Sequence, residues 1–317
     1  MKIKITLVLL ITFLVTTTGF AQNADTLFYS VVKGKDISGI QKMWMNGDQE
    51  YHFFYKYNDR GRGDSVYAAI ITGNSGQINK VVVEGVDYMK NAYNESFEIV
   101  GDSAVSIVNS DREVKPIEKE IYFGQGSPGF IEPVIKYLLQ QPDGKATVFG
   151  GGSTQAIPLM EKHFSSNGKK IQLYLCELYY NENTPPFYAW LDQDKHFFAN
   201  VNDWFSTIRS GYESLNDTLN TVQEMQAKNY YIKQMKALSD SLPAQFAVTK
   251  VRVFDAEHAI MLENMTVLIS NGKVTAVEKS NKIKIPKGYQ QINSTGKTLL
   301  PGLWDTHGHY DKGEGLN

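Results

Sequence analysis

Short runs of alternating hydrophobic and polar residues cover most of the chain between residues 23 and 203. The runs are rich in Val, Ile, Tyr and Phe, and turn residues such as Asn58–Gly61 and Asn74–Gly76 separate them. Side chains alternate between the two faces of a β-strand, so each run predicts a short strand. The predicted strands are 26–32, 51–57, 65–72, 78–86, 94–100, 104–108, 146–149, 171–180 and 187–191. Their regular spacing favours a large antiparallel sheet, curved or closed, over alternating βα units.

Two segments have the spacing of helices instead. Residues 129–141 are the only such segment within the β-rich region, and residues 205–242 form the second. The second segment lacks proline and places Ile208, Tyr212, Leu215, Leu219 and Val222 at helical intervals. It predicts one long helix, capped by Asn202 or Asp203, bent near Gly211 and stopped by Pro243. Packing of its apolar stripe on a sheet is favoured over coiled-coil dimerisation.

After Pro243 the alternating pattern of strands returns. Strands are predicted at 246–254, 259–262, 265–270, 274–278, 289–293 and 298–300. Asn271-Gly272 joins two of these runs, and Asn-Gly is the preferred pair for a type I′ hairpin turn because both positions need positive φ. The sequence therefore predicts a β-rich domain over residues 22–203, a connecting helix over 204–243, and a small β domain over 244–300.

The first residues have the pattern of an export signal. Lys2 and Lys4 precede the uncharged apolar run 5–15, and small residues lead to a cleavage site after Ala21. The run is shorter than the 20 or so residues needed to span a bilayer, so we predict that residues 1–21 are a cleaved signal peptide. The mature protein is then periplasmic or secreted, without stable membrane insertion. An uncleaved membrane anchor is the alternative.

Composition narrows the function classes. The chain has 317 residues, enough for about two domains, and its 42% hydrophobic content suffices for packed cores. A net charge of −2 argues against a nucleic-acid partner, whose binding surface would be strongly basic. The single cysteine, Cys176, excludes an intrachain disulfide, and its β-rich surroundings predict a buried, inert thiol.

The candidate chemistry lies near the end of the sequence, in Leu299–Tyr310. His307 and His309 are two residues apart, so on a strand they point to the same face, where two imidazoles can hold one divalent cation. The apolar run Leu299–Trp304 that precedes them predicts a strand buried on both sides, as in a parallel barrel.

The residues around this pair resemble the opening of the metal-dependent amidohydrolase superfamily, with imidazolonepropionase- and prolidase-like members. The resemblance rests on Val253–Ala256, on Val267–Val274 with its Asn-Gly hairpin, and on Gly296–His309, which contains the Pro-Gly and His-x-His elements. It covers about sixty-five residues in the order and spacing that the family shows. It implies part of a small β-sandwich followed by the first strand of a (β/α)₈ barrel.

The resemblance also implies a chemistry. His307 and His309 correspond to the family's paired metal ligands, and Asp305 to a residue that supports the site without binding the metal. The family uses one or two divalent ions, usually zinc, to activate water and hydrolyse C–N bonds in amides, cyclic amides or peptide-like small molecules. Its further ligands and its general-base aspartate come from later strands, which have no counterpart before Asn317. Residues 301–317 are therefore expected to begin a truncated barrel, with no catalytic residue and no activity in this chain.

The predicted fold class is thus mainly β: a large curved antiparallel domain, one long connecting helix, a small β-sandwich domain and the first strand of an incomplete (β/α)₈ barrel. The alternative function is a non-catalytic periplasmic module, in which the large sheet binds a peptide, glycan or lipid. An elongated hydrophobic cleft in the sheet would favour that alternative, and a solidly packed sheet would count against it.

Other motifs are weaker. Gly124–Gly129 matches G-x-G-x-x-G, but the acidic residue that a dinucleotide site needs about twenty positions later is replaced by glycines. Arg62-Gly63-Asp64 is typical of a hairpin tip. Asp192, Asp194 and His196 alternate and could bind a cation weakly, although a solvated loop is favoured. The remaining histidines considered, His52, His163 and His258, have no ligand spacing and are predicted to be surface or core residues.

Overall fold

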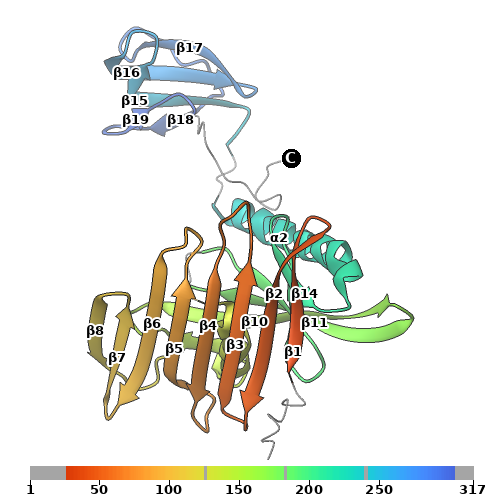
Figure 1. Cartoon of the computed structure of the whole chain (residues 1–317). Coiled ribbons are helices and arrows are strands. Elements are labelled where there is room, and N and C mark those ends of the chain that lie inside the picture. The colour runs from red at the N-terminus through yellow and green to blue at the C-terminus, as the bar shows by residue number, and fades with distance from the viewer. Residues whose placement is uncertain (1–25, 125–126, 182–183, 239–241, 304–317) are drawn as a thin grey trace, which may run out of the picture. The chain divides into compact units, whose positions relative to one another are not determined.

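The computed structural model describes residues 26–124, 127–181, 184–238 and 242–303, and the chain divides into two compact units at residues 223 and 224. The first unit contains one antiparallel sheet with the strand order β8-β7-β6-β5-β4-β3-β2-β1-β14-β13-β12-β11-β10-β9 (Figure 1). The strands are β1 Leu27–Lys33, β2 Asp36–Asn46, β3 Glu50–Tyr57, β4 Ser65–Thr72, β5 Ile78–Val86, β6 Ala92–Val100, β7 Ser103–Val108, β8 Asp111–Pro116, β9 Lys145–Thr147, β10 Ser153–Ser166, β11 Lys169–Tyr179, β12 Phe187–Leu191, β13 Phe197–Asn200 and β14 Ser206–Arg209. The predicted large antiparallel sheet is confirmed.

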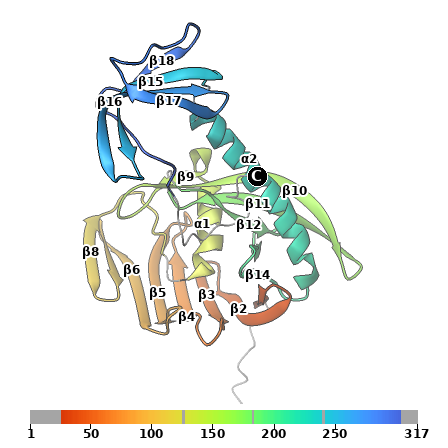
Figure 2. The same ribbon diagram turned by 90° about the horizontal axis from the view of Figure 1, so that it is seen from above.

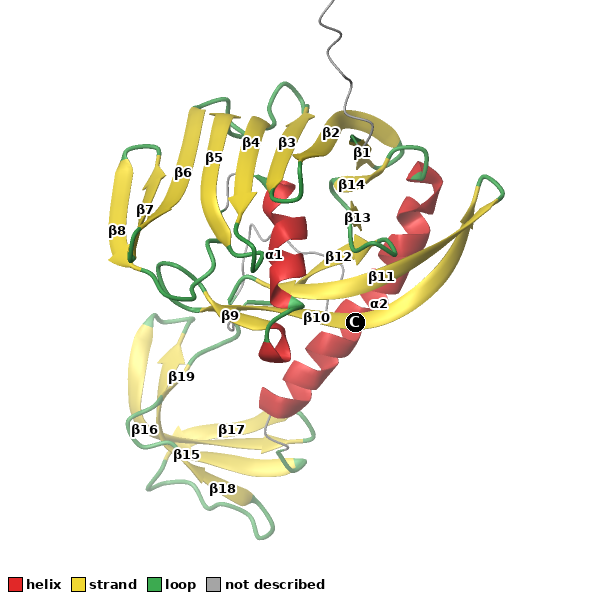
Figure 3. Cartoon of the chain, turned by 90° about the horizontal axis from the view of Figure 1, so that it is seen from below, coloured by secondary structure: helices red, strands yellow, loops and turns green. Residues whose placement is uncertain are grey.

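The strand order shows how the chain builds this sheet. Strands β1 to β8 form one meander, β9 to β14 form a second, and the first and last strands pair to join them. The segment from Ile117 to Gly144 links β8 to β9 and carries helix α1, Ile131–Leu138, preceded by the short 3₁₀ turn Pro128–Phe130. The sheet curves around this helix (Figure 3). A segment that connects opposite edges of a curved sheet thereby fills its concave face.

The core of the first unit lies between α1 and that concave face, which we call the inner face. Val134, Ile135 and Leu138 of α1 are fully buried in one cluster with alternating residues of the sheet. Burial of each such side chain stabilises the fold by about 1.5–3 kcal/mol. Close approach is possible because Gly129 lacks a side chain: a Cβ there would lie 2.7 Å from the Phe53 Cγ.

The second helix, α2, spans Asn216–Leu238 and contains the boundary between the units. The predicted helix over 205–242 is therefore wrong at its start, because residues 206–209 form β14 and only Leu215, Leu219 and Val222 of the proposed stripe are buried in or just before α2. Ile208 is buried in the sheet, where it pairs with Ser30. Asn202 does not cap a helix; its Oδ1 accepts hydrogen bonds from the N–H groups of Trp204 and Phe205 at 2.8 and 2.9 Å.

The second unit contains a five-stranded sheet (Figure 2). Its strands are β15 Gln245–Asp255, β16 Ile260–Ser270, β17 Lys273–Lys279, β18 Gln290–Asn293 and β19 Thr298–Leu299. β16 is antiparallel to β15 and β17, whereas β18 and β19 run parallel to β15. The predicted small β domain is present as a single sheet, and β16 joins two runs that were predicted as separate strands.

The hairpin turn between β16 and β17 has the predicted conformation. Asn271 and Gly272 have φ of 51° and 73°, both in the left-handed region that a type I′ turn requires. The adjacent core is small: Val251, Met265 and Val267 are buried, and Val248, Leu262 and Leu299 pack against them among others. None of the helices within the described ranges is long and apolar enough to cross a membrane.

Candidate functional site

The predicted metal ligands, His307 and His309, lie outside the described residues, as does Asp305; the predicted signal peptide, residues 1–21, does too. The structure does describe the approach to them. β19 pairs with β15 through Arg252–Thr298 and Val253–Leu299, and the Arg252 N–H donates to the Lys297 carbonyl at 3.0 Å. The segment that leads to the two histidines is thus attached to the second sheet up to Leu299.

Among the described residues beyond Leu299, no strand is present. β19 ends at Leu299, Leu300 is 50% exposed and Leu303 is 92% exposed. Pro301 has no N–H group and cannot donate to a strand ladder. The apolar composition of this run therefore does not by itself bury it, because burial needs neighbouring strands on both sides.

The described residues contain no group of three or more His, Cys, Asp or Glu side chains arranged to hold a metal ion. Each histidine among the described residues lies in an environment other than a metal site. His258 contacts Asp255 at 2.9 Å, His163 is exposed on β10, and His52 and His196 belong to the clusters described below. Cys176 is buried as predicted, and burial raises the pKa of its thiol to about 12, so it remains protonated near neutral pH.

The alternating trio Asp192, Asp194 and His196 forms the turn between β12 and β13. The Asp192 carboxylate accepts hydrogen bonds from the N–H groups of Asp194 and His196 and pairs with Arg209 at 2.8 Å. The His196 ring contacts Glu132 through its Nδ1. The Asp192 carboxylate and the His196 ring are thus engaged within the protein, which argues against the weak cation site that the spacing allows.

Glu132 is a buried acid that links three other residues. It lies on α1, its side chain is 1% exposed, and its Oε1 is 2.7 Å from the Lys136 Nζ and 2.8 Å from the His196 Nδ1. Its Oε2 accepts the Phe197 backbone N–H at 2.8 Å. Burial alone would raise the pKa of Glu132, but the hydrogen bond from His196 and the charge of Lys136 hold it below its ordinary value. The cluster attaches α1 to the β12–β13 turn.

The same contacts raise the pKa of His196 above its ordinary value of 6.5, chiefly through the hydrogen bond to Glu132. A raised pKa in the folded state contributes stability that is complete below 6.5 and is lost as pH rises through the folded-state value. The lowered pKa of Glu132 acts oppositely, with stability that is complete above 4.5 and lost as pH falls through its folded-state value.

We therefore expect this cluster to stabilise the fold most between about pH 4.5 and 6.5. Urea unfolding at a series of pH values measures this dependence. His196→Ala should flatten the loss of stability above pH 6.5, whereas His163→Ala, which changes an exposed histidine, should leave the profile as it is. An unchanged profile in His196→Ala would contradict the assignment.

A second buried acid, Glu95, projects from β6 into the inner face. It is 2% exposed and accepts hydrogen bonds from the hydroxyls of Tyr93 and Tyr122, both at 2.9 Å. Burial followed by the charge of Glu95 raises the pKa of both tyrosines, which keeps them as donors. Gly124 belongs to this cluster, because a Cβ there would lie 2.0 Å from the Glu95 Oε1. The first glycine of the G-x-G-x-x-G motif is thus explained by packing.

The opposite, outer face of the sheet carries a cluster of rings on β2, β3 and β4. Trp44 stacks on His52 with centroids 5.2 Å apart and an interplanar angle of 12°, and the Tyr67 hydroxyl is 2.5 Å from the His52 Nδ1. On the other side of the His52 ring, Nε2 lies 2.7 Å from the Asn46 Nδ2 and 3.0 Å from Glu50. His52 is 8% exposed although it is on the outer face. The rings around it are therefore held in one arrangement.

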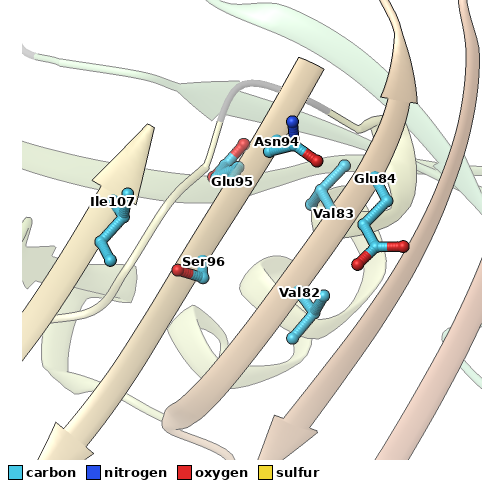
Figure 4. A pocket seen from close by; sticks show the side chains of 7 residues that line it. All are labelled: Val82, Val83, Glu84, Asn94, Glu95, Ser96 and Ile107. Carbon is cyan, nitrogen blue, oxygen red and sulfur yellow. The ribbon is translucent and has the colours of Figure 1, made fainter. Parts of the chain in front are cut away.

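Next to this cluster the outer face is hollowed, as Figure 4 shows. The hollow has a volume of about 210 Å³ and lies over β5, β6 and β7. Glu84 and Asn94 form its polar rim, and Val82, Ser96 and Ile107 lie beside them. Glu84 is the cross-strand partner of Tyr67, so the hollow and the ring cluster are continuous.

Sequence reasoning missed these three clusters. Glu95, Glu132 and His52 look like ordinary polar residues in their local sequence, and only pairing with distant residues buries them. The period-2 pattern was a partial signal for His52, because it assigns Tyr51 and Phe53 to one face and His52 to the other.

No protein-family model, curated protein or solved structure matches this chain.

Proposed function

We propose that residues 244–317 are the opening of a metal-dependent amidohydrolase, in which His307 and His309 bind a divalent metal. The single observation that carries this proposal is the order of three sequence elements: Val253–Ala256, the Asn271-Gly272 hairpin, and the Pro-Gly and His-x-His run. The described part of this stretch supports it, since residues 245–299 fold into one sheet whose β16–β17 hairpin turns at Asn271-Gly272.

The chemistry of such a site is hydrolysis of a C–N bond. His307 and His309 would hold a zinc ion, which when bound would supply an activated water and a polarised carbonyl for an amide, cyclic amide or peptide-like substrate. Two histidines are fewer than the three protein ligands usual in catalytic zinc sites, so the complete site needs at least one more ligand. His307 and His309 would contribute two of these ligands.

Metal binding tests the proposal. Zinc titration followed by calorimetry should show binding that weakens about tenfold or more in His307→Ala and in His309→Ala, since each change removes a ligand. His163→Ala, which removes an exposed histidine elsewhere, is the matched control and should bind as the unchanged chain does. Equal zinc affinity in the unchanged chain and in the double variant would contradict the proposal.

A second candidate function is non-catalytic binding by the large sheet, and the outer face favours it. The inner face holds α1 and a continuous cluster of buried side chains, so it is filled by the protein itself. The outer face instead carries exposed Tyr67 beside the hollow, and exposed Phe28 on β1 farther across the sheet. Exposed large apolar groups gathered on one face, with polar groups at their edge, are typical of binding surfaces.

A further inference from the structure

The cross-strand register places six outer-face side chains in one line across the first meander. Consecutive partners from β1 to β6 form this line, which we call the outer row: Phe28, Lys42, Phe54, Tyr67, Glu84 and Asn94. Neighbouring strands are about 4.8 Å apart, so the outer row extends for about 24 Å perpendicular to the strands. It ends in the hollow, to which Glu84 and Asn94 belong.

The rings of the outer row are accessible to a ligand. Phe28 is 47% exposed and Tyr67 is 38% exposed, while Phe54 between them is partly buried. The contact between Tyr67 and His52, with Trp44 stacked behind it, fixes Tyr67 without any ligand. A ring that is ordered before binding loses little conformational freedom when a ligand packs on it.

The polar side chains that line the hollow can form hydrogen bonds with a ligand. Within the described ranges, no hydrogen bond or ion pair involves the side chains of Glu84, Asn94 or Ser96. Together they offer a carboxylate, an amide and a hydroxyl, which are acceptors and donors for hydroxyl groups. The hollow is smaller than the roughly 300–1,000 Å³ of sites for drug-sized molecules, so it suits a single ring of a longer ligand.

The charges of this surface favour an uncharged ligand. The outer row contains one cation, Lys42, and one anion, Glu84. In the neighbouring rows Lys80 pairs with Glu98 at 2.9 Å and Glu50 contacts His52. A phosphate-bearing ligand would need a basic surface, and a strongly charged peptide would need an excess of the opposite sign. A peptide added as a strand would lie along a sheet edge and not across its face.

We propose that the outer row and the hollow bind a neutral oligosaccharide laid across the strands, with one sugar ring in the hollow. This inference rests on the second candidate function and supplies its ligand class. The apolar face of a sugar ring packs on Tyr67 and Phe54, and its hydroxyls exchange hydrogen bonds with Glu84, Asn94 and Ser96. A tyrosine combines an apolar ring with a polar hydroxyl, so it is suited to contacts that are partly apolar and partly hydrated.

Calorimetric titration with four neutral hexasaccharides, maltohexaose, cellohexaose, xylohexaose and chitohexaose, tests the proposal. We expect at least one of them to bind. Tyr67→Ala and Glu84→Ala should each weaken that binding about tenfold, which is the effect of losing one aromatic or polar contact. Trp204→Ala, which removes a ring that is 50% exposed outside the outer row, is the matched control and should bind normally. Thermal unfolding shows whether each variant is folded.

The remaining outcomes distinguish failure of the saccharide proposal from failure of the binding function on which it rests. The same variants are titrated with a basic peptide, an acidic peptide and phosphatidylcholine vesicles. Binding of one of these probes that is lost in Tyr67→Ala would keep the binding function and overturn the saccharide. Binding of no probe at all would overturn both, and saccharide binding unchanged in Tyr67→Ala and Glu84→Ala would overturn the assigned surface.

Discussion

Replacing Phe53 by alanine should lower the free energy of unfolding of the first unit by about 4 kcal/mol, because a buried aromatic side chain is deleted without a substitute. Phe53 is 1% exposed and lies on the inner face of β3, where it faces Gly129 next to α1. Gly129 has no side chain that could fill the cavity left by the Phe53 ring. Urea unfolding followed by tryptophan fluorescence measures the loss.

Phe54→Ala is the matched control for this prediction. Phe54 is the next residue on the same strand, of the same type, but it belongs to the outer row and is only partly buried. It should cost less than half as much as Phe53→Ala, while Phe53→Leu, which keeps most of the volume, should cost about 1.5 kcal/mol or less. Equal effects of Phe53→Ala and Phe54→Ala would contradict the assignment of the inner face.

Glu132→Ala should destabilise the first unit by about 3 kcal/mol. The change removes the acceptor of the Phe197 N–H and the counter-charge of Lys136 and His196. Breaking a buried ion pair costs about 3–5 kcal/mol, and the lower end applies because the side chains of Lys136 and His196 are 25% and 34% exposed and can reach water. The same unfolding measurement at pH 6 gives the value.

Two comparisons sharpen this prediction. Glu118→Ala removes an exposed glutamate from the same β8–β9 connection and should change the stability by no more than about 0.5 kcal/mol. Glu132→Gln keeps an acceptor for the Phe197 N–H but not the charge, so it should cost less than alanine and should abolish the elevation of the His196 pKa, followed by NMR titration. A Glu132→Ala effect as small as that of Glu118→Ala would show that the cluster does not attach α1.

Much of the fold was predictable from local pattern. The period-2 alternation predicted strands 65–72, 78–86 and 187–191 with the ends that the structure has, because their turns carry strong signals. β10 was missed because it contains Pro158, which lacks the N–H of a ladder. The register of β10 against β11 shifts between Pro158 and Met160, so the irregularity accommodates the proline.

Other elements depended on partners far away in the chain. β14 has only four residues. The helical spacing between its apolar residues and those of the following segment is coincidental. Its pairing with β1, about 180 positions earlier, decides that it is a strand, because both of its edges are then hydrogen-bonded. The β-pairing of a short segment is not visible within a local window.

The sequence by itself determined that this protein is mainly β, that Asn271-Gly272 makes a hairpin, and that Cys176 is buried; it also supplied the His307–His309 hypothesis. Only the tertiary structure decided that α1 fills the inner face, that Glu132 meets His196, and that the outer row aligns Tyr67 with Glu84. The physical reason is that alternation and turn chemistry act between residues close in sequence. Burial of a charge and the alignment of side chains across strands depend instead on register between segments, which no local pattern specifies.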